Sequence, residues 1–323
     1  MTTLVYSATE TDAKIAMALG GGTTSPSGGI WRNVVADYGA VGDGTTDDTG
    51  AFAAAFADIN AGVINRLYVP ALPGASAATP TKYRICSQLP TLVAQGFTIL
   101  GDGKWETQII RDYNGVAGVG CINIGGAAIG WQIESICIAS AAGRSGGSAI
   151  YVLAGADAGF TGSKASLNHV NLTTWGSDSW DNTLVFNGTL KATEPKGLRT
   201  MSLSGVEVFG AASYSVIFSG VVGLNWFGGG VWPAGGTNAN SGGILITGTG
   251  AVPSVQHMIF IGSCNGLVLN NGTKAVVLEC GQMGSIGGLS ASVDSSSVKN
   301  WIRCPDRAGG SSGFGVNGNW LNP

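Results

Sequence analysis

The sequence predicts an all-β protein built as a parallel β-helix, and three observations support this fold class. Glycine accounts for 54 of the 323 residues. Charged residues make up only 11% of the chain, which leaves few of the side chains that sustain solvated helix faces. Short apolar runs return about every 20 to 36 residues, a period typical of solenoid proteins.

The repeat consists of two series of strand-like runs that alternate along the chain. The first series covers 131–139, 166–175, 201–210, 223–232 and 254–262, and the second covers 149–154, 182–188, 214–220, 243–249 and 266–272. Each period holds two or three short strands and almost no helical pattern. In such a β-helix, every coil buries an apolar strand face against the coils above and below it.

One helix is expected, over residues 46–60, with Thr46 or Asp47 as its N-cap and Asp48 in its first turn. Its apolar residues fall on one face: Phe52, Ala55, Phe56 and Ile59. Asp43 belongs to a turn just before the helix. These three carboxylates are therefore interpreted as scaffolding, and the helix is placed to cover the exposed first coil of the solenoid.

Composition argues against several classes of partner and cofactor. The net charge is -3 with no run of basic residues, so we expect no nucleic-acid partner. Mean hydropathy is +0.26, but no window approaches 18 uninterrupted apolar residues, so we expect no membrane insertion. The six cysteines lack the close pairs that zinc requires and are predicted to be reduced core residues. No metal or other cofactor is expected.

Residues 1–29 form a separate segment without the basic start of a signal peptide. A short helix followed by the linker "GGGTTSPSGG" suggests a docking peptide, and a frayed terminus is the alternative. The expected organisation is a docking segment at 1–29, a β-helix domain at 30–305 and a Gly/Ser-rich C-terminal tail at 306–323.

The stretch "NVVADYGAVGDGTTDDTGAFAAAFADI", followed by "RLYVP", "KYRI" and "FTILGDG", resembles the N-terminal signature of pectate-lyase-like right-handed parallel β-helices. That signature is common in bacteriophage tailspikes and tail fibres. It spans residue 33 to about residue 110, and it is specific for the fold but not for chemistry. A longer loop at "ALPGASAATPTK" departs from the usual pattern without threatening the fold.

The resemblance implies a homotrimer located in the phage tail and made in the host cytoplasm. Residues 1–29 would dock onto virion tail or baseplate proteins, and the β-helix would bind host cell-surface polysaccharide. Cleavage of that polysaccharide stays open. The alternatives are a stand-alone polysaccharide lyase or glycoside hydrolase, and a purely structural virion component.

Glycoside hydrolysis needs two carboxyl groups about 5–5.5 Å or about 6.5–9.5 Å apart. Alignment of the repeats places Cys137, Asn171 and Glu207 in one column, and Glu134, Asn168 and Ser204 in another. Coils stack about 4.8 Å apart, so Glu134 and Glu207 would lie about 14 Å apart, too far for a pair. Glu207 stays a catalytic candidate without an assigned partner.

The loop 173–182 is the best sequence candidate for carbohydrate contact. Trp175 and Trp180 could stack on sugar rings, and Asp178 and Asp181 could accept hydroxyl hydrogen bonds or act as an acid–base pair. Packing of these tryptophans between subunits is the alternative. Two further glycan-binding candidates, which could extend the same surface, are Trp226 and Trp232.

Overall fold

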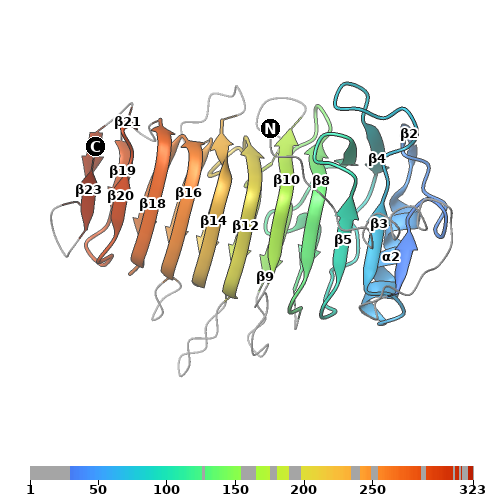
Figure 1. Cartoon of the computed structure of the whole chain (residues 1–323), viewed down its shortest axis with the longest axis horizontal. Coiled ribbons are helices and arrows are strands. Elements are labelled where there is room, and N and C mark those ends of the chain that lie inside the picture. The colour runs from blue at the N-terminus through green and yellow to red at the C-terminus, as the bar shows by residue number, and fades with distance from the viewer. Residues whose placement is uncertain are drawn as a thin grey trace, which may run out of the picture.

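The computed structural model confirms the predicted fold class, a right-handed parallel β-helix with an N-terminal helix (Figure 1). It describes residues 30–125, 128–153, 165–174, 180–188, 198–233, 241–248, 254–284, 289–307, 310–312, 314 and 319–322. The predicted docking segment 1–29 lies outside these residues. In the part of the chain described, no helix is long and apolar enough to cross a membrane.

Two parallel sheets form the walls of the solenoid. The path of the larger sheet runs through β1 (Trp31–Asn33), β3 (Arg66–Val69), β5 (Thr98–Gly101), β8 (Gln132–Ser140), β10 (Ser166–Thr174), β12 (Leu198–Phe209), β14 (Val221–Trp232), β16 (Val255–Cys264), β18 (Lys274–Met283), β20 (Trp301–Arg303) and β23 (Trp320–Asn322). Off this path lie β2 (Asp43–Asp47), β4 (Thr81–Ile85), β6 (Thr107–Arg111) and β21 (Asp306–Arg307). The second sheet comprises β22 (Gly310–Ser312), β19 (Leu289–Val293), β17 (Gly266–Asn270), β15 (Gly243–Thr247), β13 (Val216–Ser219), β11 (Leu184–Asn187), β9 (Ser148–Leu153) and β7 (Gly120–Ile124).

The long strands of the larger sheet bend at a column of residues in the left-handed backbone region. Ser135, His169, Gly205 and Gly228 occupy this corner on successive strands, with φ between 50° and 72°. Each long strand therefore has two arms, one before and one after the corner. A side chain at this φ is strained, so glycine at two of the four positions eases the bend.

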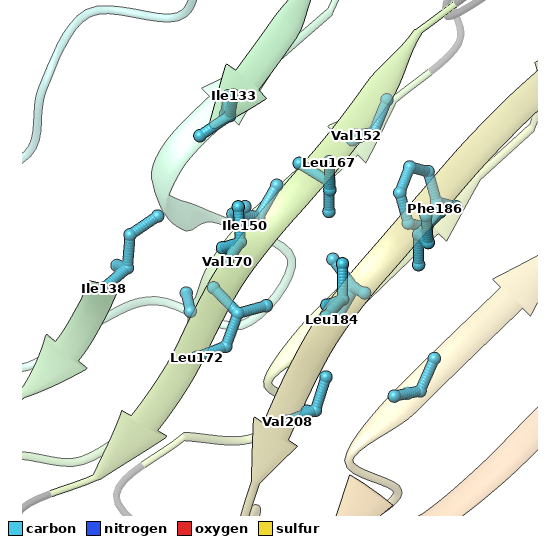
Figure 2. Packing of buried hydrophobic residues seen from close by; sticks show 14 of the residues in the cluster. Ile133, Ile138, Ile150, Val152, Leu167, Val170, Leu172, Leu184, Phe186 and Val208 are labelled. Carbon is cyan, nitrogen blue, oxygen red and sulfur yellow. The ribbon is translucent and has the colours of Figure 1, made fainter. Parts of the chain in front are cut away.

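Apolar residues on the inner side of both arms and of the second sheet fill the solenoid. Figure 2 shows Ile133, Leu167, Val170 and Leu172 of the first sheet near Ile150, Val152, Leu184 and Phe186 of the second. The sequence alignment of the coils is confirmed, because Leu167 pairs with both Ile133 and Leu203 and Val170 pairs with Ile136.

The N-terminal helix α2 spans Thr49–Asn60 and lies at the end of the solenoid opposite β23 (Figure 1). Its predicted apolar face is buried, and the ring of Phe52 packs edge-on against that of Tyr83, 5.5 Å away. The prediction that the helix starts at residue 46 is wrong, because 43–47 form β2. This covered end hides the apolar interior of the first coil.

The three acidic residues before the helix are structural, although two of them act differently from the prediction. Asp48 is the N-cap by position, yet its carboxylate accepts hydrogen bonds from the amides of Val41 and Gly42. Burial raises the pKa of Asp48. Asp47 accepts a hydrogen bond from the amide of Thr49. Asp43 accepts hydrogen bonds from the amides of Thr45 and Thr46 in its own turn.

Two further sequence predictions concern the cysteines and the C-terminal segment. All six cysteines are free and five of them are buried, as expected for reduced core residues. The predicted tail after residue 305 needs correction, because β21 pairs with β18, β22 with β19, and β23 with β20. The described parts of 306–323 thus extend the solenoid.

Candidate functional site

The sequence-predicted site residues separate into three groups in the structure. Trp175 and Asp178 lie outside the described residues. Trp180 and Trp226 are fully buried, and their indole Nε1 atoms donate hydrogen bonds to the carbonyls of Thr173 (2.8 Å) and Gly228 (3.0 Å). A buried ring cannot stack on a sugar, so the prediction of glycan contact is wrong for these two. The remaining three are Asp181, Glu207 and Trp232.

Asp181 has a structural role that sequence reasoning did not anticipate. Its carboxylate Oδ2 accepts a hydrogen bond from the amide of Gly147 at 2.8 Å, and its own amide donates to the carbonyl of Gly147 at 2.8 Å. These two bonds tie neighbouring coils together. Its pairing with Asp178 as acid and base stays an untested prediction.

Glu207 and Trp232 lie on one outer face, which we call the groove face. It consists of the outward-pointing residues on the second arms of the long strands and on β4, β6 and β21. One column of this face runs through Gln108, Cys137, Asn171, Glu207 and Gly230, and continues beyond it as Ser263, Gln282 and Asp306. The predicted column of Cys137, Asn171 and Glu207 is therefore confirmed.

A loop between β5 and β6 folds across the first part of this column. Nζ of Lys104 in this loop lies 2.9 Å from Oε1 of Glu207. Glu207 is three strands along the column from Gln108, which lies just after the loop. The loop and the extended Lys104 side chain together span the positions of Cys137 and Asn171, and both residues are only 1% exposed although they point out of the core.

Polar atoms beneath this loop lack hydrogen-bond partners among the described residues. They are both amide atoms of Asn171, Oε1 of Gln108 and Oε2 of Glu207. Buried polar groups in proteins nearly always find a partner, and each unpaired one costs about 1–3 kcal/mol. These atoms are covered by the protein, so they bear on stability rather than on direct ligand contact.

An aromatic side chain stands beside the cluster. Trp105 is 40% exposed, and the ammonium of Lys104 lies 5.8 Å from its ring centroid. Sequence reasoning missed both residues. A tryptophan in a loop beside a lysine was the available signal, whereas the contact with Glu207 could not be read from the chain.

Trp232 forms one wall of an open hollow farther along the groove face. The hollow has a volume of about 230 Å³, and its polar lining includes Ser263, Asn265, Gln282 and Asp306. The ring of Trp232 stacks on Phe209, with centroids 5.0 Å apart. Nε2 of Gln282 donates to Oδ2 of Asp306 at 3.2 Å. The partly exposed indole therefore faces amides, a hydroxyl and a carboxylate.

No metal centre accompanies these groups. Across the residues that the structure describes, no three His, Cys, Asp or Glu side chains are grouped so that they could hold an ion. The arrangement on the groove face can instead bind a polar ligand through amides, one ion pair and two exposed aromatic rings.

No protein-family model matches the chain, and no curated protein matches it. Among solved structures, the chain is similar to ORF18 of Geobacillus virus E2, with a TM-score of 0.51 and 14% identity. The match covers 91% of this chain and 61% of the viral chain, so this chain spans less than two thirds of that protein. The similarity shows a shared fold.

Two weaker likenesses involve β-helix enzymes. The A-module of the mannuronan C-5 epimerase AlgE6 of Azotobacter vinelandii is 13% identical with a TM-score of 0.32, over 90% of this chain and 99% of that module. The catalytic domain of Agl-KA is 11% identical with a TM-score of 0.34, over 90% of this chain and 66% of that domain. We base no argument on these two.

Proposed function

We propose that the chain is a subunit of a bacteriophage tail spike or tail fibre and that its groove face binds host cell-surface polysaccharide during adsorption. The observation that carries this proposal is the continuous polar and aromatic track on one outer face of the solenoid. Between Asn171 and Asp306 the track crosses five strand-to-strand steps, about 24 Å at about 4.8 Å each.

The chemistry of the track suits sugars. A sugar ring offers an apolar face that stacks on an indole, and hydroxyl groups that both donate and accept hydrogen bonds. Trp105 and Trp232 supply exposed aromatic surface at two places along the track. The amide of Gln282 and the carboxylate of Asp306 supply donors and acceptors beside Trp232. A chain of several sugar rings could contact all four residues.

Binding is favoured over cleavage by the spacing of the carboxylates. Glu207 and Asp306 flank the Trp232 hollow, but four strand steps separate them, about 19 Å. Glycosidases hold their two carboxyl groups within about 9.5 Å. Glu207 is also held by Lys104 at 2.9 Å. We therefore assign Glu207 to binding, and the stand-alone glycosidase or lyase becomes the alternative.

A homotrimer is the proposed assembly, attached to virion tail or baseplate proteins through residues 1–29. An exposed apolar ladder on the first arms supports self-association. Phe227 is 49% exposed, Met258 45% and Trp320 64%. Phe227 also stacks on Phe260 with centroids 5.4 Å apart. Large apolar side chains gathered on one sheet are typical of protein–protein contacts, whereas the groove face is polar.

The function is tested by screening the purified full-length chain against immobilised bacterial surface polysaccharides. We expect a specific polysaccharide to bind, and Trp232→Ala to weaken that binding at least about tenfold. Leu153→Ala, which removes an exposed apolar side chain from β9 in the second sheet, is the control and should bind normally. Binding by no polysaccharide would favour a structural virion component, and shortening of the polysaccharide by a monomer would favour the enzyme.

The assembly is tested separately by light scattering. A mass of three chains is expected for the wild type, and Phe227→Ser together with Met258→Ser should lower it. A wild-type mass of one chain, with 32.5 kDa as the unit, would contradict the trimer.

A further inference from the structure

We propose that the polysaccharide bound by the groove face is acidic, and that Arg84 and Arg144 bind its negatively charged groups. This inference rests on the proposed function, because it names the chemical class of the ligand for the same face.

The site is a second cavity on the groove face, nearer the N-terminal end. Its volume is about 220 Å³, and it is lined by Gly44, Lys82, Arg84, Ile110, Asp112, Ala141 and Ala142. Lys82 pairs in register with Gln108, at the root of the Lys104 loop, and Arg84 pairs with Ile110. The cavity therefore continues the same track toward β2.

Two arginine side chains share the carboxylate of Asp112: Arg84 lines the cavity together with Asp112, and Arg144 reaches Asp112 from beside it. Nε of Arg84 lies 2.6 Å from Oδ2 of Asp112, and Nε of Arg144 lies 2.7 Å from Oδ1. The side chain of Asp112 is 15% exposed, whereas those of Arg84 and Arg144 are 34% and 40% exposed. Asp112 thus fixes both guanidinium groups from below and leaves their outer edges open to solvent.

Most guanidinium donors remain available to a ligand. Each guanidinium carries five N–H groups. Among the described residues, Arg144 donates only through Nε, and Arg84 donates through Nε and through Nη1, which binds the carbonyl of Thr45 at 2.9 Å. A planar guanidinium binds carboxylate or phosphate oxygens through two parallel hydrogen bonds. Two such edges beside one cavity favour a carboxylate or phosphate substituent on the sugar chain.

Nearby carboxylates outnumber the cations of this region, so net charge does not select an anionic ligand. The cations are Lys82, Arg84, Lys104 and Arg144, and the anions are Asp43, Asp47, Glu106, Asp112 and Glu207. Asp43 and Asp47, however, direct oxygens at the amides of their own turns. Selection of an anion would therefore come from the open guanidinium donors at short range.

The experiment uses bacterial surface polysaccharides immobilised in native and carboxyl-reduced forms, with the full-length chain as the probe. Reduction converts each uronic acid to a neutral sugar and leaves the linkages unchanged. We expect binding to native uronic-acid polysaccharide to fall at least about tenfold after reduction. Arg144→Gln should cause a similar loss on the native form and little change on the reduced form.

Arg303→Gln is the matched control, because Arg303 is also an exposed arginine in an ion pair, with Glu279 at 2.9 Å on the other arm. It should bind like the wild type. If binding survives carboxyl reduction but is abolished by removing phosphate substituents, the anion is a phosphate and the inference stands. Equal binding to native and neutral forms, unaffected by Arg144→Gln, would overturn the inference and leave the proposed function intact. Binding to no polysaccharide would overturn both.

Discussion

Replacing Asn171 with leucine is expected to stabilise the folded chain. The side chain is 1% exposed, and neither its Nδ2 nor its Oδ1 has a partner among the described residues. An unpaired buried polar group costs about 1–3 kcal/mol, and leucine of similar size would remove two of them. After allowance for imperfect packing, we expect the free energy of unfolding to rise by about 1–3 kcal/mol.

The matched control is Asn300→Leu. Asn300 is fully buried, but its Oδ1 accepts from the amide of Val276 at 3.0 Å, and its Nδ2 donates to Oδ1 of Asn319 at 3.0 Å. Its replacement leaves those partners unpaired and should lower the free energy of unfolding by about 1–3 kcal/mol. Urea unfolding followed by circular dichroism measures both variants. A loss of stability in Asn171→Leu equal to that in Asn300→Leu would refute the reasoning.

Three other predictions concern the Lys104–Glu207 ion pair, the carboxylate of Asp112 and a glycine in β14. Lys104→Met and Glu207→Gln should each lower the free energy of unfolding by about 0.5–1 kcal/mol, and the double variant by less than the sum; strict additivity in urea unfolding would show that the ion pair contributes nothing. Burial raises the pKa of Asp112, but two arginine hydrogen bonds outweigh it and hold that pKa below its usual range, so the stability it contributes is present above the unfolded pKa of about 3.9 and is lost as pH falls. Asp112→Asn should therefore lose less stability than the wild type between about pH 4 and pH 2, and parallel pH curves would contradict this. Gly229→Ala should cost more than about 2 kcal/mol, because its φ is 78° and an added Cβ would collide with a carbonyl oxygen of the neighbouring strand. Gly223→Ala, with φ 79° but its nearest atom at 3.6 Å, should cost only about 1–2 kcal/mol, and equal losses in thermal melts would show that backbone strain alone decides.

The periodic part of the fold could be predicted from sequence because the coils repeat their pattern. The alternation of Ile133 and Ile136 with polar neighbours recurs in Leu167 and Val170, and this fixed both the strands and their register. The start of the helix was missed because Asp43 to Asp47 combine turn and capping residue types, while pairing of β2 with β4 decides their conformation.

The site was harder to predict because the local sequence does not show which way a side chain points or how far a loop extends. Trp226 and Phe227 are neighbours, yet the first is buried and the second is 49% exposed. Which of them faces the core depends on the phase of the strand relative to its corner. Lys104 meets Glu207 only because a loop from an early coil crosses several later strands.

The in-register columns of the groove face also fix the distance between the groups that lie along it. The guanidinium cavity near Arg84 and the aromatic hollow at Trp232 are separated by five strand steps, from β4 through β6, β8, β10 and β12 to β14. Each step adds about 4.8 Å, so the two ends stand about 24 Å apart along the stack. Duplication or deletion of one intervening coil would change that span by a single increment and leave both ends intact. Under the proposed function, such a change would alter the length of glycan that the face spans without altering the residues that contact it.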